Sequence, residues 1–216
     1  MTDVFRVEAL DFSLQDFDWR FARERRGEID AHFAKLRERK PAMWNGRVLL
    51  MHRHEIAGAT LRGSYFETDF ASFVAWRDFG FPDAAVKNAF ALGALQGSDG
   101  GYVMGVMGAH TMNAGKVYFP GGTPDLNDLK GGKVDLESSV RREVEEETGL
   151  GPAEFEIDAG WHCIPAGPMI ALLKPMRAKV SAAHLCERIR DHIASERNPE
   201  LADAVVARGA DDIRPT

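Results

Sequence analysis

The sequence predicts an α/β (α+β) fold with a mixed sheet covered by helices, preceded by a smaller N-terminal α/β extension. Two apolar runs, residues 86–97 and 102–109, are separated by the turn sequence Ser-Asp-Gly-Gly and indicate a β-hairpin. Apolar residues then recur at helical spacing in 135–148 and 184–196, with strand-like segments between them. Strands followed by helix, strands and helix are typical of this class.

The N-terminal region, residues 1–85, begins with a segment that predicts one long helix over residues 16–40, ended by Pro41. Arginine and lysine side chains on its other face could attract phosphates, but the glutamates among them favour a solvated face of ion pairs. Residues 44–58 predict one or two strands, and residues 66–81 predict an aromatic helix closed by Pro82. Five aromatics here could stack a nucleobase, although their spacing is more typical of a core: Trp44, Tyr65, Phe66, Trp76 and Phe79.

The C-terminal region, residues 86–216, continues after the hairpin with a loop (109–115) and a short strand (116–119). A glycine-rich connection leads to a helix that starts after Asp135, a good N-cap, and stops at Gly149. Residues 155–158 and 168–174 predict further strands. The second helix, 184–196, follows them.

Composition narrows the class of function. The chain has 216 residues, a net charge of −6 and a pI of about 5.7, which do not favour binding to nucleic acid or an anionic membrane. Two cysteines are too few for a disulfide framework or a cysteine-based zinc site. With neither a signal-peptide pattern nor a membrane-length apolar run, we expect a cytoplasmic location.

The helix that starts after Asp135 carries an unusual charge pattern. On a helical wheel, Leu136, Val140 and Val144 form an apolar stripe, and Glu143 and Glu147 fall on or beside it. Glu146 lies at the edge of the stripe with Ser139, whereas Glu145, Arg141 and Ser138 fall on the opposite side. Crowded carboxylates beside apolar packing raise one another's pKa and destabilise the helix. A divalent cation such as Mg²⁺, which takes carboxylate oxygens as ligands, reverses that effect and predicts a metal site.

The segment Arg-Glu-Val-Glu-Glu-Glu-Thr-Gly-Leu at 142–150 resembles the second half of the Nudix box, and the Pro-Gly-Gly loop at 120–122 resembles its opening. The resemblance implies a Nudix-type α/β/α sandwich over residues 86–216 and a hydrolase acting on diphosphate bonds. It implies metal binding (Mg²⁺ or Mn²⁺) by Glu143, Glu146 and Glu147, with Arg142 able to brace one glutamate. Gly121 and Gly122 would let the backbone approach the helix and the phosphates.

The chain departs from the family pattern at one place. Val134 stands where the family usually has the first glutamate of the box, and residues 127–133 look like an insertion. Asp135 or Glu137 are candidate replacements. A catalytic base often lies on a later loop in this family, which suggests Glu200 and, after it, Glu196. His110 is read as a surface histidine, with contact to a phosphate as the alternative.

The resemblance also bears on the substrate, a nucleoside diphosphate linked to a second group. The N-terminal layout is loosely similar to UDP-sugar diphosphatases and favours a nucleotide-sugar-like substrate. Residues 114–125 resemble part of the coenzyme A diphosphatase signature, which gives a first alternative. A catalytically weak nucleotide-sensing module is the second alternative, because of Val134. We expect a small-molecule partner, a possible homodimer, and neither nucleic acid nor membrane as partners; binding of nucleic acid through residues 20–40 is the outside hypothesis.

Overall fold

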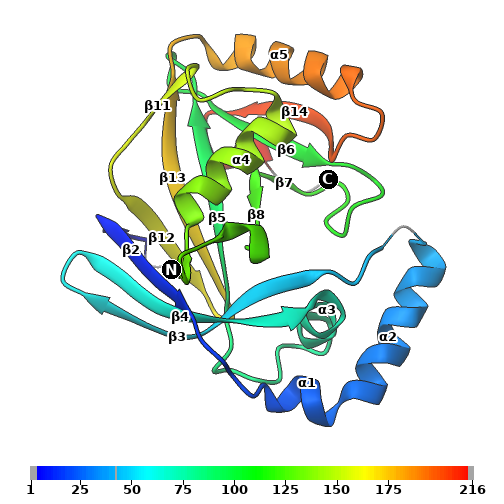
Figure 1. The fold of residues 1–216 in the computed structure, drawn as a ribbon. Coiled ribbons are helices and arrows are strands. Elements are labelled where there is room, and N and C mark those ends of the chain that lie inside the picture. Colours follow the sequence, from blue (N-terminus) through cyan, green and yellow to red (C-terminus); the bar gives the residue numbers. More distant parts are fainter. Residues whose placement is uncertain (1–3, 42, 214–216) are drawn as a thin grey trace. The chain divides into compact units, whose positions relative to one another are not determined.

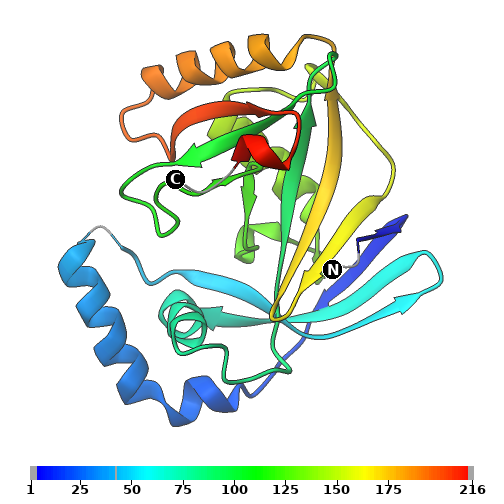
Figure 2. The same cartoon turned by 180° about the vertical axis from the view of Figure 1, so that it is seen from behind.

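The protein has an α+β fold, as the sequence predicts (Figures 1 and 2). The structure is a computed structural model that describes residues 4–41 and 43–213. These residues fall into two compact units that alternate along the chain. Unit 1 takes the described parts of Met1–Phe90, Thr123–Leu136 and Cys163–Ala171, and unit 2 those of Ala91–Gly122, Glu137–His162 and Leu172–Thr216. The boundary expected between residues 85 and 86 stays a prediction.

The sheet of unit 1 has the strand order β3-β4-β2-β10-β9. Its longest strands, β3 (Arg47–Ala57) and β4 (Thr60–Asp69), form the antiparallel hairpin visible in Figure 1. β2 (Ala9–Leu14) joins β4 in parallel. β1 (Phe5–Val7) and β12 (Trp161–Ala166) pair with each other in the other sheet, where β12 continues to β13. The strands β1, β2 and β12 were not predicted. A run of fully buried apolar side chains in β3 contributes to the core of this unit: Leu49, Leu50 and Met51.

The prediction of a single helix over residues 16–40 is wrong in two respects: the helix begins later than expected, and it is interrupted. The chain stays non-helical up to Trp19, then forms α1 (Arg20–Glu24) and α2 (Arg26–Arg39). Arg25 separates the two helices with φ −108° and ψ 23°, outside the helical region.

Long-range contacts of two aromatic side chains explain the late start. The Phe17 ring stacks on His52 with ring centroids 4.5 Å apart, and Trp19 Nε1 donates to Asp83 Oδ2 at 3.1 Å. These partners are distant in sequence, so tertiary packing overrides the helical spacing of the apolar residues.

The basic face of these helices is paired with acidic residues, as the sequence favoured. The ion pairs within the segment include Arg20–Glu24 at 2.7 Å, Arg25–Glu28 at 2.6 Å and Arg26–Asp30 at 3.5 Å, and Arg23 pairs with both Asp18 and Glu24. This arrangement fits a solvated face laced with ion pairs.

The helix expected over residues 66–81 is shorter, because Phe66–Asp69 completes β4. Asp69 caps α3 (Phe70–Asp78), and its side chain accepts a hydrogen bond from Ser72 N at 2.9 Å. An aspartate in this place satisfies a free amide of the first turn and fixes where the helix begins.

The predicted insertion, residues 127–133, extends the sheet of unit 1. A 3₁₀ turn (Leu126–Asp128) leads into β9 (Leu129–Lys130), and two glycines with positive φ turn the chain into β10 (Lys133–Val134). β10 pairs antiparallel with β2, and Lys133 Nζ lies 2.6 Å from Asp11 Oδ1. The insertion is therefore a hairpin with partners of its own.

The sheet of unit 2 contains the predicted hairpin. It consists of β5 (Asn88–Gln96), which begins in unit 1, and β6 (Tyr102–Met107), antiparallel to it. The strand order continues from β13 (Met169–Ala178) through β5 and β6 to β14 (Leu201–Ala207), with three short strands at the flanks: β7 (Val117–Tyr118), β8 (Gly121–Gly122) and β11 (Phe155–Ile157). The strands expected at 116–119, 155–158 and 168–174 are thus confirmed with shifted bounds, whereas β14 was not predicted.

Two helices complete unit 2. α4 (Leu136–Thr148) buries Val140 and Val144, and Gly93 of β5 makes room for it, since a Cβ there would lie 2.5 Å from Val144 Cγ2. α5 (Ala182–Ser195) starts at the N-cap Ser181 and packs on β14 and β6. Both cysteines are buried and unbonded. No helix in residues 4–41 and 43–213 has both the length and the apolar character needed to cross a membrane.

Candidate active site

Helix α4 places its glutamates at graded depths. Glu147 is buried with 7% of its surface exposed, the Glu143 side chain is 21% exposed and that of Glu146 60%. Glu145 is exposed. Glu143 and Glu147 therefore lie on the packed side of the helix, as the helical wheel predicts, whereas Glu146 is exposed like Glu145.

A hydrogen bond joins Glu147 to the glycine loop of the same unit. Gly121 N donates to Glu147 Oε1 at 3.3 Å, and Figure 1 shows α4 beside β8. Gly121 has a φ of 137°, and a Cβ there would lie 2.2 Å from Ala91 O, so only glycine fits this close approach. Gly122 has open space around its Cα and carries no such requirement.

The surroundings of Glu147 disfavour its negative charge. Burial, together with the charges of Glu200, Glu143 and Glu146, raises the pKa of this carboxyl to about 9, although the hydrogen bond from Gly121 opposes the rise. Its Oε2 atom is buried and has no hydrogen-bond partner among the described residues. A buried acceptor without a partner is costly, and a cation placed there would remove the cost.

Arg142 holds the two outer glutamates. Its Nη1 lies 2.7 Å from Glu143 Oε1 and 3.0 Å from Glu146 Oε2. The sequence predicted that it could brace one glutamate, and it contacts two. In residues 4–41 and 43–213 no group of three or more His, Cys, Asp or Glu side chains is close enough to hold a metal ion. A ready-made cage is therefore absent from the described part of the chain.

Further polar groups of unit 2 act on the same carboxylates. Glu200, immediately before β14, has a pKa raised by partial desolvation and by Glu146, while His110 lowers it. Burial, together with Glu147 and Glu200, raises the pKa of Tyr118 in β7 to about 12, although its hydrogen bond with Asn113 opposes the rise. The sequence missed Tyr118, because no pattern distinguishes a single tyrosine in a short strand. Glu196 Oε1 lies 3.6 Å from His192 Nε2, and the same nitrogen lies 3.1 Å from the backbone oxygen of Glu146.

The candidates to replace the missing box glutamate are already engaged in ion pairs. Val134 itself is buried in unit 1, where Asp135 lies 2.9 Å from Lys130 Nζ. In unit 2, Glu137 contacts Arg141 at 2.8 Å and the buried Lys174 at 3.0 Å. We infer that Glu137 stabilises the start of α4.

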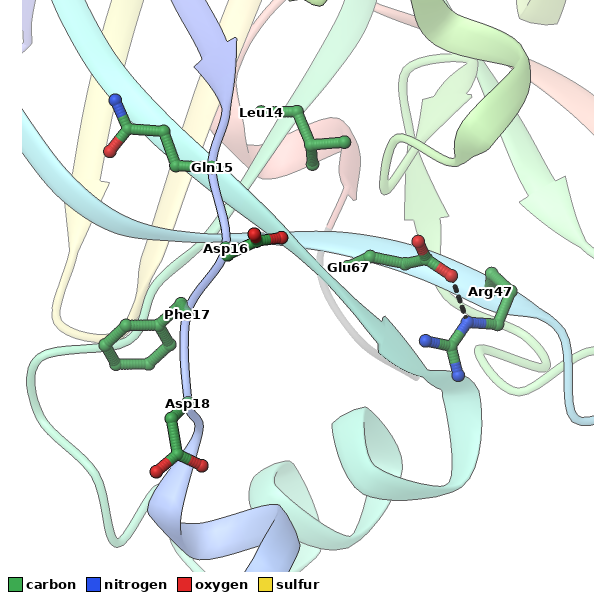
Figure 3. Close-up of a pocket in the computed structure, with 7 residues that line it drawn as sticks. All are labelled: Leu14, Gln15, Asp16, Phe17, Asp18, Arg47 and Glu67. Atoms are coloured by element: carbon green, nitrogen blue, oxygen red, sulfur yellow. Dashed lines mark hydrogen bonds and ion pairs between the residues drawn. The ribbon is translucent and has the colours of Figure 1, made fainter.

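Unit 1 has a separate pocket of about 420 Å³ beside the segment that precedes α1 (Figure 3). In Figure 3 the Asp16 carboxylate points toward Glu67, whose Oε1 accepts from Arg47 Nε at 2.5 Å. The Phe17 ring lies on the other side of the segment. The remaining lining residues are Leu14, Gln15 and Asp18.

The aromatic residues of unit 1 serve its core, which was the favoured prediction. Tyr65, Phe66 and Trp76 are at most 1% exposed, and Tyr65 Oη donates to Ala89 O at 3.0 Å. Phe79 is half-buried and packs edge-on against Phe21 and His32, whereas Trp44 is 81% exposed.

A scan against protein-family models found no match, and a search of curated proteins found no relative. Among solved structures, the chain is similar to the Nudix hydrolase RenU from M. smegmatis, with 14% identity over 59% of this chain and 75% of that one, at a TM-score of 0.37. The MutT protein from Methanosarcina mazei Go1 shares 20% identity over 44% of this chain and 70% of that one (TM-score 0.29). The Bacillus subtilis pyrophosphohydrolase BsRppH shares 12% over 60% and 66% (TM-score 0.30). At these TM-scores the similarities do not assign an activity. The chain resembles Nudix hydrolases in the motif of α4 and has a solved Nudix hydrolase among the structures similar to it.

Proposed function

We propose that the protein hydrolyses the diphosphate bond of a nucleoside diphosphate linked to a second group, with Mg²⁺ or Mn²⁺ as cofactor. The observation that carries this proposal is the buried Glu147, whose Oε2 has no described partner and whose charge is opposed by three further carboxylates. Such a group is costly in a folded protein unless a cation compensates it. The match of residues 142–150 to the Nudix box supports hydrolysis of a diphosphate bond as the reaction.

The residues present fit a divalent ion bound together with its substrate. Mg²⁺ commonly takes one or two carboxylates and completes its ligand set with phosphate oxygens and water. Glu143, Glu146 and Glu147 are the proposed protein ligands, and Arg142 competes with the ion for the first two. The described residues contain no group of three such donors close enough to hold the ion by themselves, so the proposed site needs phosphate oxygens and water as further ligands. When bound, the ion supplies charge neutralisation at the phosphates and lowers the pKa of bound water.

The chain's own residues would divide the remaining work. Gly121 presents backbone beside Glu147 and lets phosphate come close to α4. Glu200 is the proposed general base, because its raised pKa lies closer to neutrality than that of an ordinary glutamate. Glu200 is also exposed, so a proton taken from water can pass to solvent. Arg142 would orient Glu143 and Glu146.

The substrate is proposed from the sequence resemblance alone. A nucleotide-sugar-like diphosphate is favoured by the layout of the N-terminal region, with coenzyme A as the alternative. A small-molecule substrate and a possible homodimer complete this proposal.

A second function, nucleotide sensing with weak turnover, is favoured by one specific observation. The place of the first box glutamate is occupied by Val134, which is buried, and both neighbouring acids are held in ion pairs. A site that lacks one carboxylate would bind a metal–nucleotide complex more weakly and turn it over slowly.

The test is a panel of nucleotide sugars, coenzyme A, dinucleoside polyphosphates and ADP-ribose, each with Mg²⁺, with Mn²⁺ and with a chelator. We expect metal-dependent release of a nucleoside monophosphate from at least one. In Glu146→Gln, turnover should fall by about 10² or more, because a metal ligand is lost. Glu145→Gln, on the exposed side of the same helix, is the matched control and should keep the wild-type rate. Equal rates in both variants would refute the ligand assignment, and tight binding without turnover would support the sensor.

A further inference from the structure

A polar chain of three side chains leads from solvent to the candidate site within unit 2. Lys116 Nζ donates to Asn113 Oδ1 at 3.2 Å, and Asn113 Nδ2 donates to the Tyr118 hydroxyl at 3.2 Å. All three belong to the loop after β6 and the short strand β7. None was among the residues that the sequence pointed to.

The chemistry of these three side chains fixes which of them donates and which accepts in each hydrogen bond. A lysine ammonium can only donate, so it holds the oxygen of the Asn113 amide toward Lys116 and the NH₂ group toward Tyr118. The Tyr118 oxygen then accepts, and its single proton is directed elsewhere. In residues 4–41 and 43–213 the structure gives that proton no acceptor, as Asn113 is the only described hydrogen-bond partner of the hydroxyl.

Tyr118 lies three residues before Gly121, whose N–H donates to the site carboxylate of Glu147 at 3.3 Å. Burial, together with the negative charges of Glu147 and Glu200, raises the pKa of Tyr118 to about 12. The phenol therefore keeps its proton at neutral pH. It is a neutral donor in a site otherwise crowded with acceptors, two residues before the Pro-Gly-Gly loop.

We propose that Tyr118 donates a hydrogen bond to a phosphate oxygen of the bound substrate, and that Asn113 and Lys116 orient the hydroxyl for this contact. A diphosphate brings oxygens that only accept, which matches the unused donor. This inference rests on the proposed function and adds a substrate-contacting residue to it. A hydrogen bond to a charged acceptor is worth a factor of about 10 to 100 in an equilibrium or rate constant.

The direct test removes only the hydroxyl. Tyr118→Phe should lower kcat/KM for the best diphosphate substrate about 10- to 100-fold and weaken binding of inorganic pyrophosphate with Mg²⁺ by a similar factor. Tyr102→Phe is the matched control, because Tyr102 lies on β6 with its ring edge against Phe119, 5.7 Å between centroids, and has no proposed role. Thermal unfolding of both variants should match the wild type. An unchanged kcat/KM and pyrophosphate affinity in Tyr118→Phe would overturn the inference.

The orienting role has a second test with a distinct signature. Asn113→Asp replaces the donor by a carboxylate that only accepts, so the Tyr118 proton should turn toward residue 113 and away from the substrate. We expect most of the Tyr118→Phe loss in Asn113→Asp, and almost no further loss when the two changes are combined. A full additional loss in the double variant, or wild-type kinetics in Asn113→Asp, would contradict the proposed orientation.

The experiments distinguish a failure of the Tyr118 contact from a failure of the proposed hydrolase function. If the wild type hydrolyses no diphosphate, the pyrophosphate titration by calorimetry still compares wild type with Tyr118→Phe. Weaker binding in the variant then supports the Tyr118 contact, although the hydrolase proposal fails. Equal affinities, or no binding by the wild type, overturn the contact.

Discussion

Replacement of Glu147 by glutamine should stabilise the metal-free protein at neutral pH. Glutamine has nearly the shape of glutamate and its oxygen can still accept from Gly121 N, the bond that measures 3.3 Å in the wild type. The substitution removes an ionisable carboxyl that is 7% exposed and whose negative charge burial, Glu200, Glu143 and Glu146 all disfavour. A residue kept as a metal ligand, the role proposed for Glu147, is expected to weaken the metal-free fold, because function and not stability has then been selected.

The magnitude follows from the pKa. The Glu147 pKa is raised from 4.5 to about 9 on folding, so between these values the native state keeps a proton that the unfolded chain has lost. The unfolded state then binds fewer protons, and the free energy of unfolding falls as pH rises, by about 1.4 kcal/mol per pH unit. At pH 7 the loss amounts to about 3 kcal/mol, and none of it is present below pH 4. The glutamine variant lacks this term, and its own buried amide group reduces the net gain by about 1 kcal/mol.

Urea denaturation of both proteins in chelator at pH 5, 6, 7 and 8 is the assay. The difference in free energy of unfolding should widen with pH in favour of Glu147→Gln, by about 4 kcal/mol over this range. Saturating Mg²⁺ should narrow it, because the ion stabilises only the carboxylate form. Parallel pH profiles for the two proteins would show that Glu147 ionises normally and would refute the reasoning.

Two further predictions concern the supports of the site. Gly121→Ala should destabilise the protein by about 2–4 kcal/mol in thermal unfolding, since its Cβ would lie 2.2 Å from Ala91 O at a φ of 137°. Gly122→Ala is the control, and its stability should stay within about 0.5 kcal/mol of the wild type. Equal effects of the two substitutions would contradict the close approach at Gly121. Glu137→Gln should lower the free energy of unfolding by about 2–4 kcal/mol in urea denaturation, because it leaves the ammonium of Lys174, which is 3% exposed, without its carboxylate partner. Lys174→Met removes the buried charge itself and should cost about 1 kcal/mol or less. A larger loss in Lys174→Met than in Glu137→Gln would contradict this explanation.

The fold was predictable where the pattern is local. The stripe of Val140 and Val144 fixes the buried face of α4 because helical periodicity needs only neighbouring residues. β14 was missed because it depends on a distant partner: Leu201 pairs with Met107, and the polar Asp203 interrupts the apolar pattern. The same reason explains residues 16–19, whose aromatic contacts are with residues 52 and 83.

In the candidate site, too, residues placed by local helical periodicity were predictable, whereas residues placed by strand pairing were not. The depths of Glu143 and Glu147 follow from the helical wheel, so the sequence placed them correctly on the packed side. Tyr118 approaches these carboxylates only through the pairing of β7 with β6, opposite Gly105, and no single-residue signal reports such a register. The orientation of Arg142 toward two glutamates likewise needed side-chain geometry.

The hairpin formed by residues 129–134 affects how the chain can be shortened. The Pro-Gly-Gly loop and α4 are joined covalently through this hairpin, which takes its hydrogen bonds from β2 at the N-terminal end of the sequence. A chain trimmed to residues 86–216 would lose β2 and leave β10 with an open edge, free to pair with other molecules. Aggregation of such a fragment would then reflect the missing strand, and its lack of turnover would say nothing about the glutamates.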